Sequence, residues 1–120
     1  MAGRLFVLVV TQDPRLEHQA LAAVRAAGCL PMLGHPDEEC PAALKRTLPD
    51  IVLIDALNPC ATSPAFYAEA AALGVRVITL ASDARDDHAR AVARRQNAPC
   101  VTLPTEYDLV PSTLGVAELR

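Results

Sequence analysis

One carboxylate, Asp55, is the strongest candidate in this sequence for a chemically active group. It follows the apolar run Ile51–Ile54, and such a run is typical of a strand buried on both faces of a parallel sheet. In an open α/β sheet, ligands bind beside the carboxyl ends of the strands. Asp55 is therefore a candidate site residue. The alternative interpretation is structural, with Asp55 capping the loop that follows the strand.

Other polar residues have simpler interpretations. Asp13 and Pro14 are typical of a helix start, with the Asp as N-cap and the Pro at the first helical position. The three histidines, His18, His35 and His88, fall in different segments. Nothing in the sequence pairs them with a nucleophile, so we expect them to be exposed or locally hydrogen-bonded rather than catalytic.

The sequence lacks the local motifs of several catalytic and ligand-binding classes. Ser63 and Ser82 lie outside any nucleophile-elbow pattern. The phosphate-binding loops GxGxxG and GxxxxGKS/T are absent. There is also no Thr-rich phosphate loop after the first apolar run, as flavin-binding flavodoxins have, and no Asp-x-His-x-x-Gly of cobalamin-binding modules. We therefore expect a protein that is not an enzyme and carries no cofactor.

Charge and hydropathy argue against a nucleic-acid-binding protein and against a membrane protein. The 120 residues carry a formal net charge of −3, which gives no electrostatic basis for binding nucleic acid or anionic lipid. The apolar run Leu5–Val10 is too short for a membrane span or a signal peptide. We expect a soluble cytoplasmic protein that binds neither membranes nor nucleic acid directly.

The cysteines show no CxxC or CxxxxH spacing, so their pattern does not indicate a metal site. We expect reduced thiols, the usual state in the cytosol. The four cysteines are Cys29, Cys40, Cys60 and Cys100.

Apolar runs alternate with segments of helical spacing. Gly28 is a stop signal after the first helical stripe, and Pro41 and Pro49 bracket the second helix. Right-handed crossovers then predict one α/β domain over residues 1–120, a doubly wound five-stranded parallel sheet of flavodoxin-like order 2-1-3-4-5. The expected strands are Leu5–Val10, Leu30–Leu33, Ile51–Ile54, Val75–Ala81 and Cys100–Leu103.

The expected fourth helix, Asp83–Gln96, has an unusual composition. Val92 is its one large aliphatic residue, so its contribution to the core should be small. Its arginines give a basic surface, which is either an ordinary solvated face or a surface for a partner. The candidate partner surface consists of Arg85, Arg90 and Arg94. Pro111 and Gly115 weaken the short helix that is expected after the last strand.

Several runs together resemble the receiver domain of two-component response regulators, over nearly the whole chain. The resemblance rests on Phe6–Pro14, on Ala43-Leu44 and Pro49–Asp55, on Pro59 four residues beyond that acid, and on Leu103-Pro104. It implies phosphoryl transfer from a histidine kinase to Asp55. It also implies a magnesium ion held by Asp55 and an acid pair after the first strand, and a hydroxyl residue and a lysine that hold the phosphoryl group.

The helper positions depart from this receiver pattern. They hold Thr11 and Gln12 for the acid pair, with Asp13 one place further on, Ala81 for the hydroxyl, with Ser82 beside it, Leu103 for the lysine, and Cys100 for the aromatic switch residue. Magnesium is normally held by carboxylates, and phosphoryl transfer depends on cations where negative charge develops. The resemblance is therefore to a degenerate receiver, or pseudo-receiver, in which Asp55 is vestigial.

Three functions follow from this interpretation. The leading one is a non-enzymatic signal-transduction module that binds a protein partner or a second copy of itself. The second is an atypical phosphoacceptor that uses Asp55 with magnesium, and the third is a sensor of a small ligand in the cleft at the strand ends. The chain could also be the N-terminal module of a longer protein, with an effector domain after Arg120.

Overall fold

The computed structural model describes residues 5–34, 39–81 and 87–103, in which strands and helices alternate. The strands are β1 (Phe6–Val10), β2 (Leu30–Leu33), β3 (Ile51–Asp55), β4 (Arg76–Ala81) and β5 (Cys100–Thr102). The helices are α1 (Pro14–Ala26), α2 (Cys40–Thr47), α3 (Pro64–Ala72) and α4 (Asp87–Arg95), and a 3-10 helix, η1 (Pro59–Thr62), precedes α3. All five expected strands are present, and η1 is an element that the sequence did not predict.

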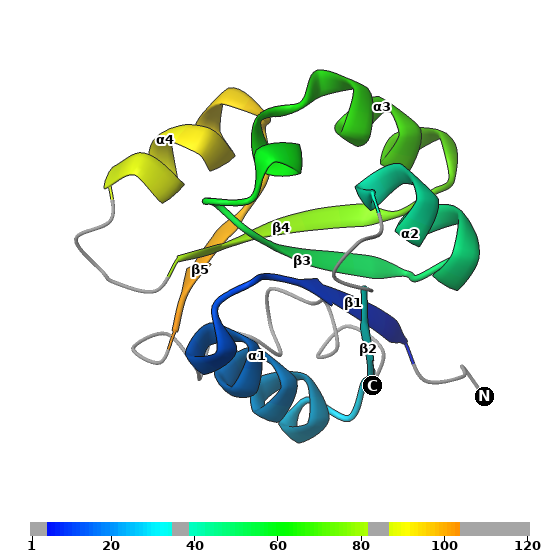
Figure 1. Ribbon diagram of the computed structural model, residues 1–120, viewed down its shortest axis with the longest axis vertical. Helices are drawn as coiled ribbons and strands as arrows, with labels where there is room; N and C mark the ends of the chain where they lie inside the picture. The colour runs from blue at the N-terminus through cyan, green and yellow to red at the C-terminus, as the bar shows by residue number, and fades with distance from the viewer. Residues whose placement is uncertain (1–4, 35–38, 82–86, 104–120) are drawn as a thin grey trace.

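The strands form one parallel sheet in the order β2-β1-β3-β4-β5, which confirms the predicted fold class. Helix α1 covers one face of the sheet, and α2, α3 and α4 cover the other (Figure 1). The central strand β3 is buried along its whole length. Because all strands run the same way, Thr11 after β1 and Asp55 at the end of β3 reach the same edge of the sheet.

Small and aliphatic side chains fill the core on both faces of the sheet, as the low aromatic content predicts. On the α1 face, Leu16 and Val24 pack with Val9 and other strand residues. On the opposite face, Phe66 of α3 is fully buried and packs in a cluster that also includes Val92 of α4. Val92 is the one large aliphatic residue of α4, and two alanines supply the rest of its buried side.

Left-handed residues end three of the helices in the Schellman pattern. After α1, Gly28 has a φ of 82°, and its N–H donates to the Arg25 carbonyl at 3.0 Å while that of Cys29 donates to the Val24 carbonyl at 3.1 Å. The same pair of hydrogen bonds follows α3, with Gly74 in the left-handed position, and α4, with Asn97. These caps fix where each chain segment turns back into the sheet.

Helix α2 ends differently, because a leucine occupies its left-handed position. Leu48 has a φ of 46°, and its N–H donates to the Leu44 carbonyl at 2.9 Å. The next residue is Pro49, which has no N–H, so the second hydrogen bond of the Schellman pattern cannot form. Leu48 is 63% exposed. Its conformation is therefore strained without a gain in burial.

The edge strand β2 contains a proline whose orientation follows from the strand register. The Leu30 N–H points toward β1 and donates to the Leu5 carbonyl at 2.8 Å. Alternate residues of a strand direct their backbone polar groups to opposite sides, so Pro31 and Leu33 face away from β1. Pro31 has no N–H to offer on that side, and the Leu33 carbonyl accepts a hydrogen bond from Arg46 Nη2 at 3.4 Å.

Two expectations about the helices lie outside the described residues. These are the first turn of the fourth helix, at positions 83–86, and the short helix after the last strand. Among the residues that the structure describes, no helix is both long enough and apolar enough to cross a membrane.

The expectation of reduced thiols is wrong at Cys60. Cys60, in η1, is disulfide-bonded. Spacing along the chain does not indicate this bond, because a disulfide depends on proximity in the folded protein. Disulfides are rare in the cytosol, so this bond counts against the cytoplasmic location, which stays a prediction.

Candidate functional site

Asp55 lies at the carboxyl end of β3 and is almost fully buried, with 8% of its surface exposed. Its Oδ2 accepts a hydrogen bond from the Thr11 hydroxyl at 2.8 Å, and its Oδ1 accepts one from the Leu57 N–H at 3.0 Å. Its backbone carbonyl also accepts from the Asn58 N–H at 2.9 Å. The carboxylate thus joins the ends of β1 and β3 and caps the loop after β3, as the structural interpretation expects.

Asp13 is the N-cap of α1, with Pro14 in the first turn, as the sequence predicts. Its Oδ1 accepts hydrogen bonds from the Arg15 N–H at 2.9 Å and the Leu16 N–H at 3.4 Å. Its own N–H donates to Thr11 Oγ1 at 3.1 Å. The Thr11 hydroxyl therefore links the start of α1 to Asp55, and one oxygen of Asp13 is committed to the cap.

A pocket of about 260 Å³ opens beside Asp55, between the ends of β1 and β3. It is lined by Gln12, Asp13, Asp55, Leu57, Asn58 and Pro59. The structure thus brings together two of the carboxylates and the amide that the sequence nominated, and it adds the loop after β3. Within the residues described, no three His, Cys, Asp or Glu side chains are grouped so that they could hold a metal ion.

The positions that a receiver uses for its hydroxyl and lysine are apolar and buried. Ala81 ends β4 and packs with Ala56 and Ala89, and Cys100 packs against this cluster. Leu103 has no exposed surface and belongs to the core on the α1 face. The Leu103 N–H donates to the Ala81 carbonyl at 2.9 Å, so the two positions are neighbours.

The loop between β3 and α3 is held by several hydrogen bonds. Asn58 is the N-cap of η1, and its Oδ1 accepts from the Cys60 N–H at 2.9 Å. The Tyr67 hydroxyl donates to the Ala61 carbonyl at 2.9 Å. Burial raises the pKa of Tyr67 above its ordinary value, and the Thr79 hydroxyl offsets part of that rise. The loop is therefore braced from both α3 and its own backbone.

The candidate partner surface is described only in part. Arg90 and Arg94 are exposed on α4, which supports the expectation of a basic face, while Arg85 and Ser82 lie outside the described residues. The predicted exposure of the histidines is confirmed for His18 of α1 and for the histidine of α4, and the third histidine lies outside the described part.

Leu57 and Asn58 are pocket residues that the sequence did not indicate. An Asn-Pro pair signals a turn, so the Asn58-Pro59 step could have indicated a tight loop directly after Asp55. Leu57 carries no such signal, because exposure of an apolar side chain depends on how the loop folds.

Comparisons with known proteins establish the fold. No protein-family model and no curated protein matches the sequence. Among solved structures, a response regulator receiver protein from Burkholderia phymatum matches with a TM-score of 0.70 and 23% identity, covering 93% of this chain and 96% of that one. A response regulator CheY-like protein from Mesorhizobium loti has a TM-score of 0.65 and 19% identity, with 94% and 98% covered.

A third structure, a CheY-like protein from Pseudomonas aeruginosa, has a TM-score of 0.68 and 17% identity, covering 93% of this chain and 98% of that one. All three matches span nearly the whole of both chains, at identities that establish the architecture and not the chemistry. Together with the strand order, they show that this chain has the receiver fold of response regulators.

Proposed function

We propose that this chain is a signal-transduction module of receiver fold that acts by protein–protein contact, without phosphoryl transfer and without bound magnesium. It would act as a pseudo-receiver, in which the aspartate after β3 has a structural role. The observation that carries the proposal is the burial of a leucine, Leu103, where a receiver has its lysine.

Phosphoryl transfer depends on positioned cations and donors around the transferred group. Leu103 and Ala81 offer neither charge nor a side-chain hydrogen bond, and both pack in apolar clusters. Losing one preorganised donor elsewhere costs about 3–4 kcal/mol in a reaction barrier. Two such losses at neighbouring positions argue against catalysis of phosphorylation at Asp55.

The groups near Asp55 also fit magnesium poorly. Magnesium prefers near-octahedral oxygen ligands, usually carboxylates. One oxygen of Asp13 caps α1, and both oxygens of Asp55 already accept hydrogen bonds, from Thr11 and Leu57. A metal ion would have to share the Asp55 oxygens with these donors, and the exposed amide of Gln12 would bring no charge in return.

For the partner surface we propose the exposed arginine face of α4, with Arg90 and Arg94 at its centre. Both arginines are exposed to solvent, which suits this face to polar contacts. Charged contacts of this kind act mainly on association rate and are weakened by salt. The partner is either another protein or a second copy of this chain.

The test of the chemical part is incubation with a small phosphodonor, with and without magnesium, followed by intact mass measurement. We expect no phosphorylated species in either condition, with an active receiver as the positive control. A magnesium-dependent phosphoryl adduct that disappears in Asp55→Asn would overturn this proposal in favour of the atypical phosphoacceptor.

The test of the partner surface is charge reversal on α4. Arg90→Glu with Arg94→Glu should weaken self-association in sedimentation, or partner capture in a pull-down, with little change in melting temperature. The matched control reverses Arg15 and Arg25, which are exposed on α1 across the sheet, and makes the same change in net charge. Equal effects of the two double variants would mean that only net charge matters.

A further inference from the structure

We infer that the pocket beside Asp55 receives a cationic side chain of a protein partner, with Leu57 as the apolar anchor next to it. This inference rests on the proposed function, since it assigns a second contact point to the same interaction module. The receiver resemblance assigns this site to a metal ion and a phosphoryl group. In this protein we assign the same site to a peptide segment of the partner.

The size of the pocket suits a single side chain. Its volume of about 260 Å³ equals roughly nine water molecules in the liquid. Pockets for drug-sized ligands and cofactors usually begin at about 300 Å³ and extend to 1,000 Å³. The pocket is thus on the small side for a nucleotide or flavin and large enough for the end of an arginine or lysine.

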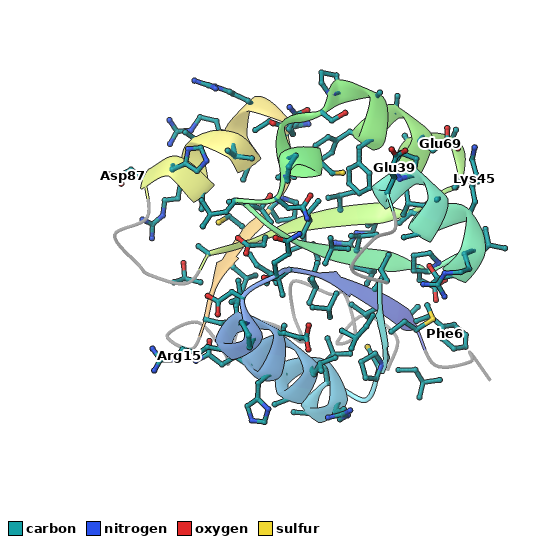
Figure 2. All side chains as sticks on the ribbon, in the orientation of Figure 1. Phe6, Arg15, Glu39, Lys45, Glu69 and Asp87 are labelled. Atoms are coloured by element: carbon teal, nitrogen blue, oxygen red, sulfur yellow. The ribbon has the colours of Figure 1, made fainter. Side chains whose placement is uncertain are left out.

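The charge of the pocket favours a cation. Among the described residues, its lining contains two carboxylates, Asp13 and Asp55, and no cationic residue. Asp55 is more than nine-tenths buried, and within the described part of the chain its side chain accepts hydrogen bonds from two neutral donors, a hydroxyl and a backbone amide. A carboxylate has about four lone-pair sites, so a further donor can still be accepted. Arg15, the cationic residue closest in sequence to Asp13, extends away from the body of the protein (Figure 2).

Leu57 supplies the apolar part of the site. It lines the pocket and is 75% exposed, more than any other large hydrophobic residue that the structure describes. Its N–H is held by Asp55 Oδ1, and the loop behind it is fixed by Asn58 and by the Tyr67 hydroxyl. An exposed side chain on a braced loop loses little conformational entropy when it is covered, which favours its use as a binding anchor.

Together these features specify the partner by its chemistry. A segment with an arginine or lysine beside a large apolar residue would place its cation against the carboxylates and its apolar group on Leu57. Arginine fits best, because its planar guanidinium can donate to two acceptors at once. Helix α4 of a second copy is a poor occupant, since its exposed face has arginines and no large apolar residue in the described part.

The experiment is an NMR titration of the ¹⁵N-labelled protein with acetyl-leucyl-arginine amide. The control probe is acetyl-leucyl-citrulline amide, which has nearly the same shape and no charge. We expect salt-sensitive shifts at the amides of Gln12, Leu57 and Asn58, with the arginine probe binding about tenfold more tightly, as for a charge-assisted hydrogen bond. No shift at these amides, or equal binding of the two probes, would overturn the inference.

Two pairs of variants separate specific binding from general effects. Asp13→Asn keeps an N-cap residue but removes one charge from the pocket, and Asp87→Asn removes a charge from the start of α4. Leu57→Ala removes the anchor, and Leu73→Ala shortens another exposed leucine, at the end of α3. Only the first variant of each pair should weaken the arginine probe, several-fold or more. Equal effects within either pair would contradict the assignment.

The same titration distinguishes this inference from the proposed function. The α4 variant Arg90→Glu with Arg94→Glu should bind the arginine probe as the wild type does. If that variant loses its native partner while the pocket binds no probe in either protein, the interaction module stands and the pocket assignment fails. If the wild type binds the probe at the pocket but is activated by phosphorylation of Asp55, the pocket assignment stands and the proposed function fails.

Discussion

Replacing Thr11 by valine tests the role of the hydroxyl that links β1, α1 and Asp55. Valine has nearly the shape of threonine, so the substitution removes two hydrogen bonds with little change in packing. One is the 2.8 Å bond donated to Asp55 Oδ2, and the other is the 3.1 Å bond accepted from the Asp13 N–H. Asp55 would then keep one side-chain hydrogen bond, from Leu57.

The expected loss can be worked from these contacts. A hydrogen bond to a charged group contributes about 1.5–3 kcal/mol, and one between neutral groups about 1 kcal/mol. Thr11 is partly buried, and water can replace only part of what is lost. We expect the free energy of unfolding to fall by about 1–2 kcal/mol. For a chain of 120 residues this lowers the melting temperature by about 3–8 °C.

Equilibrium urea unfolding of the wild type, Thr11→Val and Thr11→Ser measures this loss. The serine variant keeps the hydroxyl and is the matched control for the lost methyl group. A double-mutant cycle with Asp55→Asn should give a coupling energy of about 1 kcal/mol between the two side chains. If Thr11→Val is no less stable than Thr11→Ser, or if the coupling is zero, the hydroxyl does not support Asp55 and the structural role assigned to this aspartate is wrong.

Three further outcomes are expected. Leu48→Gly should stabilise the protein by about 1 kcal/mol in urea unfolding, because glycine adopts the left-handed conformation without strain; a loss of stability would show that the exposed leucine makes a contact of its own. Tyr67→Phe should cost about 1 kcal/mol near neutral pH through the lost bond to Ala61. Because the folded-state pKa of Tyr67 is raised, its contribution is present below the ordinary value of 10.0 and is lost as the pH rises through the folded value. The gap between the two proteins should therefore narrow in alkaline urea titrations, and a constant gap would contradict the shift. Thr11→Asp with Gln12→Asp should create measurable magnesium binding in isothermal titration where the wild type shows little, and tight magnesium binding by the wild type would oppose the pseudo-receiver proposal.

The sequence predicted the sheet because each strand is a separate apolar run and each helix carries its own start or stop signal. Gly28 and Asp13 are examples, since a left-handed glycine and an N-cap aspartate act through their immediate neighbours. The end of α2 was harder to predict. Pro49 indicated that the helix stops, but nothing local indicated that Leu48 would take the left-handed position.

The sequence predicted several residues of the candidate site, but not which of them are joined by hydrogen bonds. The sequence placed Asp55 and Thr11 at strand ends, and parallel pairing brings those ends to one edge. Which donor reaches which oxygen of Asp55 depends on how the following loop folds. The fold of that loop also places Leu57 beside the pocket. The disulfide at Cys60 escaped prediction for the same reason.

The proline in β2 has a consequence for how copies of this protein can meet. An open edge strand normally invites another chain to add to the sheet, which is a route to domain swapping and fibrillar aggregation. Here Pro31 withholds a donor on the outward side, and Arg46 occupies the outward carbonyl of Leu33. Recruitment of a neighbouring strand along β2 is therefore disfavoured, so a partner that meets this edge would have to be recognised by side chains. Pro31→Val would restore the missing donor, so edge-to-edge association of copies through β2 should increase at high protein concentration.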